Sequence, residues 1–124
     1  MKKILWIALL FVVSAASAAD RVQFRLDTSE ADAVLAILDK RAAGTPVTEA
    51  DWQKLFNSPP YARLKKREAS LHRDFTDEDF KRFVLSEDLA KRAPLLHRTL
   101  DAWKKADLNA AANRILPYLP ADAK

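Results

Sequence analysis

The sequence predicts an all-α fold of five to six short helices stacked as helical hairpins. Apolar residues recur at intervals of three and four along most of the chain, the spacing that places them on one face of a helix. Twice, a threonine is followed three positions later by an aspartate, a pairing typical of helix starts. The 124 residues include one glycine, whereas β-sandwiches and β-barrels need several for their tight turns.

Residues 1–18 have the layout of a cleaved signal peptide. Lys2-Lys3 provides a positive start, ten apolar residues follow from Ile4 to Val13, and Ala16-Ser17-Ala18 fits the small-x-small cleavage rule. As a helix, such a run reaches about 15 Å, half the thickness of a bilayer core, so no permanent membrane span is expected. We therefore expect a protein exported to the periplasm or the exterior, in which residues 19–124 form a single helical domain.

Composition excludes several classes of function. Without cysteine the chain has no disulfide framework, no Cys-based zinc finger and no thiol nucleophile, and with one glycine it has no glycine-rich phosphate loop. Loss of Lys2 and Lys3 with the signal peptide lowers the formal net charge from +4 to +2. Acidic and basic residues alternate along the rest of the chain, as on a solvated surface, so a nucleic-acid partner is not expected.

Residues 22–26 predict a short strand or extended arm. Val22, Phe24 and Leu26 alternate with polar residues, which gives a period of two. No second strand is predicted to pair with this one. It therefore either crosses the helices as an arm or lacks its partner strand.

A first helix is predicted over about 29–43. Asp27 or Ser29 can cap its start, and Gly44 can end it in the left-handed conformation. The apolar positions at helical spacing are Ala31, Val34, Leu35, Leu38 and Ala42.

The two threonine–aspartate pairs predict two short helices. One runs from a Thr48 cap to about Asn57, and the other begins at a Thr76 cap and ends before Ser86. We expect the first to bury Trp52, Leu55 and Phe56, and the second to bury Phe80, Phe83 and Val84.

A serine then starts a further helix after each short one. Ser58, followed by two prolines, starts a helix over about 59–73, because proline is tolerated in a first turn. Ser86 starts a long helix, and a last helix covers about 107–116. The apolar stripe of the long helix consists of Leu89, Ala93, Leu96, Leu100 and Trp103.

Residues 47–62 and 75–90 match at an offset of 28 positions. The pairs in register are Val47/Phe75, Thr48/Thr76, Asp51/Asp79, Trp52/Phe80, Leu55/Phe83, Phe56/Val84, Ser58/Ser86, Tyr61/Leu89 and Ala62/Ala90. Convergent capping chemistry and true duplication both explain the match. Either way, the chain is expected to be a stack of helical hairpins.

No catalytic or cofactor-binding residue is predicted. Glu68 and His72 lie one turn apart in the predicted helix 59–73, which makes them the candidate metal ligands of the chain; the alternative is a surface hydrogen bond between them. A catalytic zinc site needs three protein ligands, and no H-E-x-x-H motif occurs here. The other histidine, His97, is expected to be half-buried and structural. The chain alone is therefore expected to have no cofactor.

Five segments nevertheless carry a family resemblance. In order, they are ADAVLAILDKR (31–41), DWQKLFNSPPYARLKKRE (51–68), FTDEDFKRFVLSEDL (75–89), LHRTLDAWKKADL (96–108) and LPYLP (116–120). Together they resemble the N-terminal helical region of a family of bacterial exported proteins assigned as zinc-dependent peptidases. Members of that family continue into a section that bears an H-E-x-x-H zinc motif.

The resemblance implies that residues 19–124 are an incomplete N-terminal part of a larger peptidase-like protein. Zinc is implied only for full-length relatives, and no catalytic or metal residue carries over onto this chain. Two functions remain open: one wall of a peptidase cleft, covered by a missing C-terminal domain, or a free-standing periplasmic or extracellular module that binds another exported protein.

Overall fold

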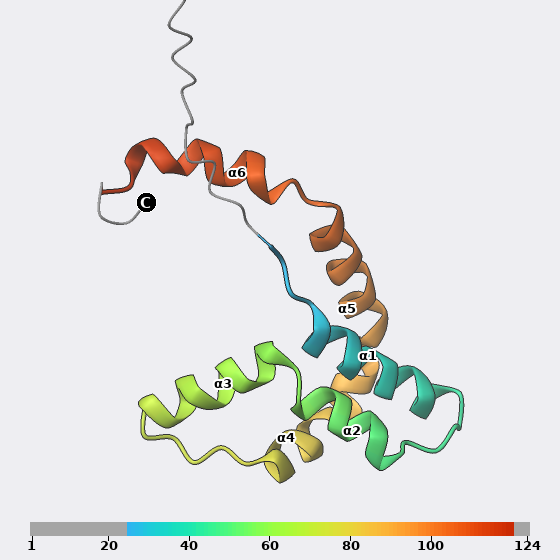
Figure 1. The fold of residues 1–124 in the computed structure, drawn as a ribbon. Helices are drawn as coiled ribbons and strands as arrows, with labels where there is room; N and C mark the ends of the chain where they lie inside the picture. Colours follow the sequence, from blue (N-terminus) through green and yellow to red (C-terminus); the bar gives the residue numbers. More distant parts are fainter. Residues whose placement is uncertain (1–24, 121–124) are drawn as a thin grey trace, which may run out of the picture.

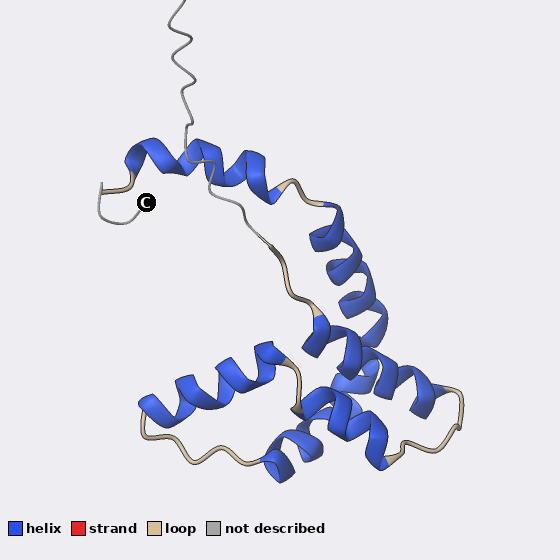
Figure 2. Ribbon diagram, in the orientation of Figure 1, coloured by secondary structure: helices blue, strands red, loops and turns tan. Residues whose placement is uncertain are grey.

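The computed structural model describes residues 25–120, and every regular element within them is helical (Figure 2). The elements, in chain order, are α1 (Ser29–Ala42), α2 (Glu49–Phe56), α3 (Pro59–Ser70), α4 (Asp77–Val84), α5 (Glu87–Lys105), α6 (Leu108–Ile115) and the 3-10 turn η1 (Leu116–Tyr118). The all-α prediction is confirmed. The signal peptide and residues 22–24 of the predicted arm lie outside the described residues, while Arg25 and Leu26 belong to no helix or strand.

Helix α1 is the centre of the fold, because α2, α3, α4 and α5 all pack against it (Figure 1). It is therefore covered on more than one side. Ala33 and Ile37 are buried in addition to the predicted Leu35 and Leu38, and the predicted Ala31 is exposed. The core continues through an aromatic series in which Tyr61 contacts three other rings. The buried core residues outside α1 are Trp52, Leu55, Tyr61, Phe80, Val84 and Leu89.

Helices α1 and α5 run antiparallel, and two ion pairs and one histidine–carboxylate contact join them. Asp32 near the start of α1 contacts Lys104 near the end of α5, at 2.6 Å. Further along, Asp39 contacts His97 at 2.8 Å, and Arg41 contacts Glu87 at 3.3 Å. The order of these three contacts along the two helices shows that α1 and α5 run in opposite directions.

The 28-residue match in the sequence corresponds to a repeated backbone. Helices α2 and α4 begin and end at equivalent positions, and α3 and α5 begin at equivalent positions. The N–H groups of Ser58 and Ser86 donate to the carbonyls of Leu55 and Phe83, each at 3.1 Å. The side chains diverge, because Leu55 is fully buried whereas Phe83 is 54% exposed. The prediction that Phe83 is buried was wrong: among residues 25–120, no element covers α4 on that side as α1 covers α2.

Helix α6 leaves the body of the molecule. The chain is extended at Ala106, with φ −69° and ψ 134°, and α6 and η1 continue beyond that point as a projecting segment (Figure 1). We call residues 108–118 the arm. Within residues 25–120, no helix is long and apolar enough to cross a membrane.

Candidate functional site

The candidate metal ligands Glu68 and His72 do not share a helix. Helix α3 ends at Ser70, three residues earlier than predicted, and His72 follows it in the left-handed conformation with φ 54°. The N–H of His72 donates to the carbonyl of Ala69, and the N–H of Arg73 donates to the carbonyl of Glu68, both at 3.0 Å. These two bonds form a Schellman motif, which closes the helix and turns the chain away.

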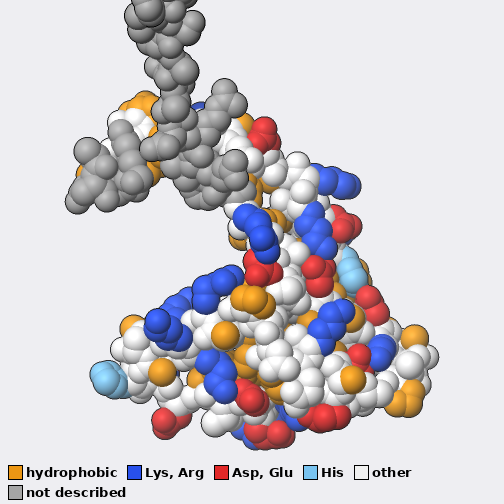
Figure 3. All heavy atoms as spheres, in the orientation of Figure 1, with side chains coloured by type: hydrophobic (Ala, Val, Ile, Leu, Met, Phe, Trp, Pro, Cys, Tyr) orange, Lys and Arg blue, Asp and Glu red, His pale blue; other side chains and the backbone are white. Residues whose placement is uncertain are grey.

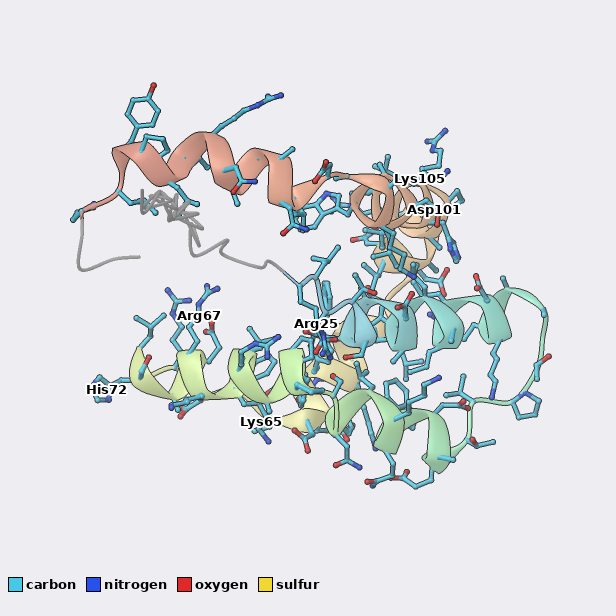
Figure 4. All side chains as sticks on the ribbon, turned by 45° about the horizontal axis from the view of Figure 1, so that its top comes forward. Arg25, Lys65, Arg67, His72, Asp101 and Lys105 are labelled. Carbon is cyan, nitrogen blue, oxygen red and sulfur yellow. The ribbon has the colours of Figure 1, made fainter. Side chains whose placement is uncertain are left out.

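The side chains of Glu68 and His72 also point to different surroundings. The Glu68 carboxylate pairs with Arg73 at 3.3 Å and with Arg67 at 3.6 Å. His72 lies at the tip of α3 and points away from the protein (Figure 4). Across residues 25–120, no group of three or more His, Asp or Glu side chains is placed to hold a metal ion. His97 is half-buried, as predicted, and pairs with Asp39 across the α1–α5 contact.

An apolar groove of about 430 Å³ lies between α1 and α5. We call it the α1–α5 groove. Phe83 of α4 closes one side of it, and the segment before α1 contributes Leu26. The remaining apolar lining residues are Ala31, Val34, Leu35, Leu89, Leu96, Leu100 and Trp103.

The groove exists because α5 is longer than the surface that covers it. Its apolar stripe alternates steps of four and three from Leu89 to Trp103, the seam spacing of a coiled coil. Leu89 is buried, Leu96 and Leu100 are half-buried, and Trp103 is 59% exposed. The stripe could be predicted from the sequence. Its increasing exposure from Leu89 to Trp103 could not, because it depends on which part of α5 the helix α1 covers. The seam therefore has room for a further helix.

The charged residues that line the groove are both acidic, Asp27 and Glu30. Asp27 is engaged locally: its carboxylate accepts from the Ser29 N–H at 3.1 Å and from the Ser29 hydroxyl at 2.7 Å, which lowers its pKa. Glu30 is half-buried, and burial raises its pKa against the opposing effect of the Arg63 charge. Among the described residues, Glu30 has no hydrogen bond and no ion pair. It is a carboxylate without a direct ion pair at the edge of an apolar groove.

Basic side chains gather elsewhere. Lys and Arg side chains follow α3 on the face shown in Figure 3, and none of them lines the α1–α5 groove. The groove therefore combines apolar walls with acidic charge alone. No protein-family model, curated protein or solved structure matches the chain.

Proposed function

We propose that this chain is an exported docking domain that binds an amphipathic helix in the α1–α5 groove. The observation that carries the proposal is the groove itself, with the exposed aromatic rings of Phe83 and Trp103 at its walls. Contiguous apolar surface of this kind marks interaction sites, and grooves between helices bind the apolar face of a further helix.

The dimensions of the groove fit such an occupant. Leu89 and Trp103 are fourteen positions apart on α5, a span of roughly 21 Å, which matches a bound helix of about 14 residues. With α1 and α5 already antiparallel, a third helix would complete a three-helix bundle.

The acidic charge of the groove also indicates which side chains a bound helix should carry. Within residues 25–120 Glu30 forms no ion pair, although the charge of Arg63 acts on it, and a half-buried carboxylate is stabilised further when a directly contacting cation is supplied. We therefore expect the bound helix to carry a Lys or Arg beside its apolar face.

Fluorescence anisotropy with a synthetic probe tests this proposal. The probe is a labelled amphipathic peptide of about 14 residues, with leucines at seam spacing and one lysine, and its control is the same composition in scrambled order. We expect saturable binding of the probe to the mature chain. Phe83→Asp should weaken binding about tenfold or more, because it places a charge in the apolar groove.

Leu85 supplies the matched control. It follows α4, is 41% exposed and does not line the groove, so Leu85→Asp should leave binding unchanged. Equal loss in both variants, or equal binding of the scrambled peptide, would contradict docking in the groove.

A second proposal rests on the family resemblance. The five quoted segments support a role as one wall of a zinc-dependent peptidase, with the catalytic residues outside this sequence. The α1–α5 groove would then be covered by the rest of that protein. Reading the coding sequence beyond the Lys124 codon tests this: an H-E-x-x-H motif there would favour it, and its absence would favour the free-standing docking domain.

A further inference from the structure

The arm, residues 108–118, leaves large apolar side chains exposed near its end, while Ala112 at its centre is buried and Leu108 is half-buried. Among the described elements, α6 packs mainly against η1 (Figure 1). Ile115 is 55% exposed and Tyr118 is 86% exposed, although both are large apolar side chains. Extended backbone at Ala106 directs the arm away from α5.

The arm has the properties expected of a ligand for the α1–α5 groove. Its eleven residues span roughly 16 Å, within the roughly 21 Å of the groove. Leu108, Ala112 and Ile115 recur at helical spacing, which gives the arm an apolar face. Arg114 lies beside that face and, within residues 25–120, has no hydrogen bond or ion pair.

Acidic and basic groups that form no ion pair within residues 25–120 thus occur on the two surfaces that would meet. Glu30 is the half-buried carboxylate of the groove, and Arg114 is the cation of the arm. The groove also continues toward the start of the arm: a second pocket of about 260 Å³ shares Leu26, Thr28 and Trp103 with the groove and reaches Leu108.

We propose that the arm of one copy occupies the α1–α5 groove of a second copy, with Arg114 of one chain paired with Glu30 of the other. The proposal rests on the proposed docking function and names its occupant. Each chain carries both a groove and an arm, so a reciprocal exchange satisfies both surfaces in a closed two-fold dimer. Exchange is favoured over folding back because the extended backbone at Ala106 separates the arm from its own groove.

Sedimentation equilibrium of the mature chain, from low micromolar to submillimolar concentration, tests the exchange. We expect a monomer–dimer equilibrium with a concentration-dependent blue shift of Trp103 fluorescence, because dimerisation covers this exposed indole. Ile115→Asp should raise the dimer dissociation constant about tenfold or more. Leu95 is equally exposed at 55% but lies outside the groove and the arm, so Leu95→Asp should not change it.

A charge exchange tests the pairing itself. Glu30→Lys and Arg114→Glu should each weaken the dimer. The double variant should recover most of the lost affinity, because an ion pair forms again with the two charges exchanged. Failure of the double variant to recover, with all three variants folded by circular dichroism, would overturn the Glu30–Arg114 pairing.

The outcomes separate this inference from the proposed function. A chain that stays monomeric throughout, or a dimer unaffected by Ile115→Asp, overturns the arm exchange. The probe peptide is measured in parallel on the Ile115→Asp variant, whose groove is free of the arm. Binding there that is sensitive to Phe83→Asp would preserve the docking function without the exchange, and loss of both would overturn both.

Discussion

Gly44 and His72 occupy the same backbone position at the ends of α1 and α3, with φ of 66° and 54°. Each donates its N–H to a carbonyl of the last helical turn, Arg41 and Ala69 respectively, at 3.1 Å and 3.0 Å. Glycine adopts this left-handed conformation without penalty, whereas a residue with a Cβ is strained by about 1–2 kcal/mol. The glycine marked one helix end in the sequence. A histidine carries no such signal, which is why the end of α3 was misplaced and the Glu68–His72 pair was drawn on one helix.

Exchanging the two residue types should move stability in opposite directions. Gly44→Ala should lower the free energy of unfolding by about 1 kcal/mol, and the cost lies in the backbone because no atom lies within 4 Å of the added Cβ. His72→Gly should raise it by up to about 1 kcal/mol, since relief of strain exceeds the added freedom of the unfolded chain. Urea denaturation measures both, and shifts of the same sign would contradict the shared role.

Zinc should not bind tightly to residues 19–124. Glu68 is held by Arg73 and Arg67, and His72 lies beyond the helix end, so these two side chains do not form part of a tetrahedral ligand set. Calorimetry with zinc at neutral pH should show no micromolar one-to-one binding, and His72→Ala and His97→Ala should behave alike. Tight binding that is lost in His72→Ala alone would contradict this account.

At the scale of the elements, the two short helices α2 and α4 depend on their first turns. In α4 the Thr76 hydroxyl accepts from the Asp79 N–H at 3.1 Å, and the Thr76 N–H donates to the Asp79 carboxylate at 3.2 Å. In α2 the Asp51 carboxylate accepts from the N–H and the hydroxyl of Thr48, at 2.8 Å and 2.9 Å. Because these contacts are local, the sequence alone was enough to predict both helix starts.

Thr76→Ala should destabilise the protein by about 1 kcal/mol, which lowers the melting temperature by roughly 4–8 °C in a domain of this size. Thr99 is the matched control, since its hydroxyl lies within α5 and donates to the carbonyl of Leu95 at 3.0 Å. Thr99→Ala should have a much smaller effect. Thermal melts followed by circular dichroism compare the two, and equal shifts would count against the helix start at Thr76.

Acid should weaken the contact between α1 and α2. Lys40 donates to both carboxylate oxygens of Asp51 at 2.7 Å, and this bond, followed by those from Thr48, lowers the pKa of Asp51 from 3.8 to about 2. Because the folded-state pKa lies below the unfolded value, the stabilisation is present above about pH 4 and is lost as the pH falls toward 2.

Denaturation curves between about pH 5 and pH 2 measure this contribution. Asp51→Asn should reduce the loss of stability across that range. Asp88→Asn is the control, because Asp88 is exposed and has no ion pair or hydrogen bond among the described residues. Unchanged acid sensitivity in Asp51→Asn would show that other carboxylates dominate.

Burial was harder to predict than helix boundaries, because burial depends on neighbours distant in sequence. Ile37 lies off the predicted stripe of α1 yet is 1% exposed, since several helices surround α1. Phe83 fits a buried pattern yet is exposed, since nothing described covers that side of α4. The groove was therefore beyond prediction, although every apolar residue of its α5 wall had been placed on the correct stripe.

For the whole molecule, the balance between core and surface bears on the apolar side chains that are exposed at the groove and the arm. A domain of this length buries only about two-thirds of its chain surface and has little stability to spare. It nevertheless leaves Phe83, Trp103 and Ile115 more than half exposed. Covering these side chains by a second copy, a partner helix or a further domain would add the apolar burial that the isolated chain lacks.

The expected place of this association is outside the cytoplasm, and the signal peptide provides the test. Residues 1–18 lie outside the described part of the structure, and their charged start, apolar run and Ala16-Ser17-Ala18 predict cleavage and export. N-terminal sequencing of the exported form should begin at Ala19, or at Asp20 if cleavage shifts by one residue. Ala18→Arg should block cleavage, because the position before the cut requires a small side chain, and should leave the uncut chain in the membrane fraction. Recovery of the unaltered protein there at full length would contradict a cleaved signal and indicate a retained anchor.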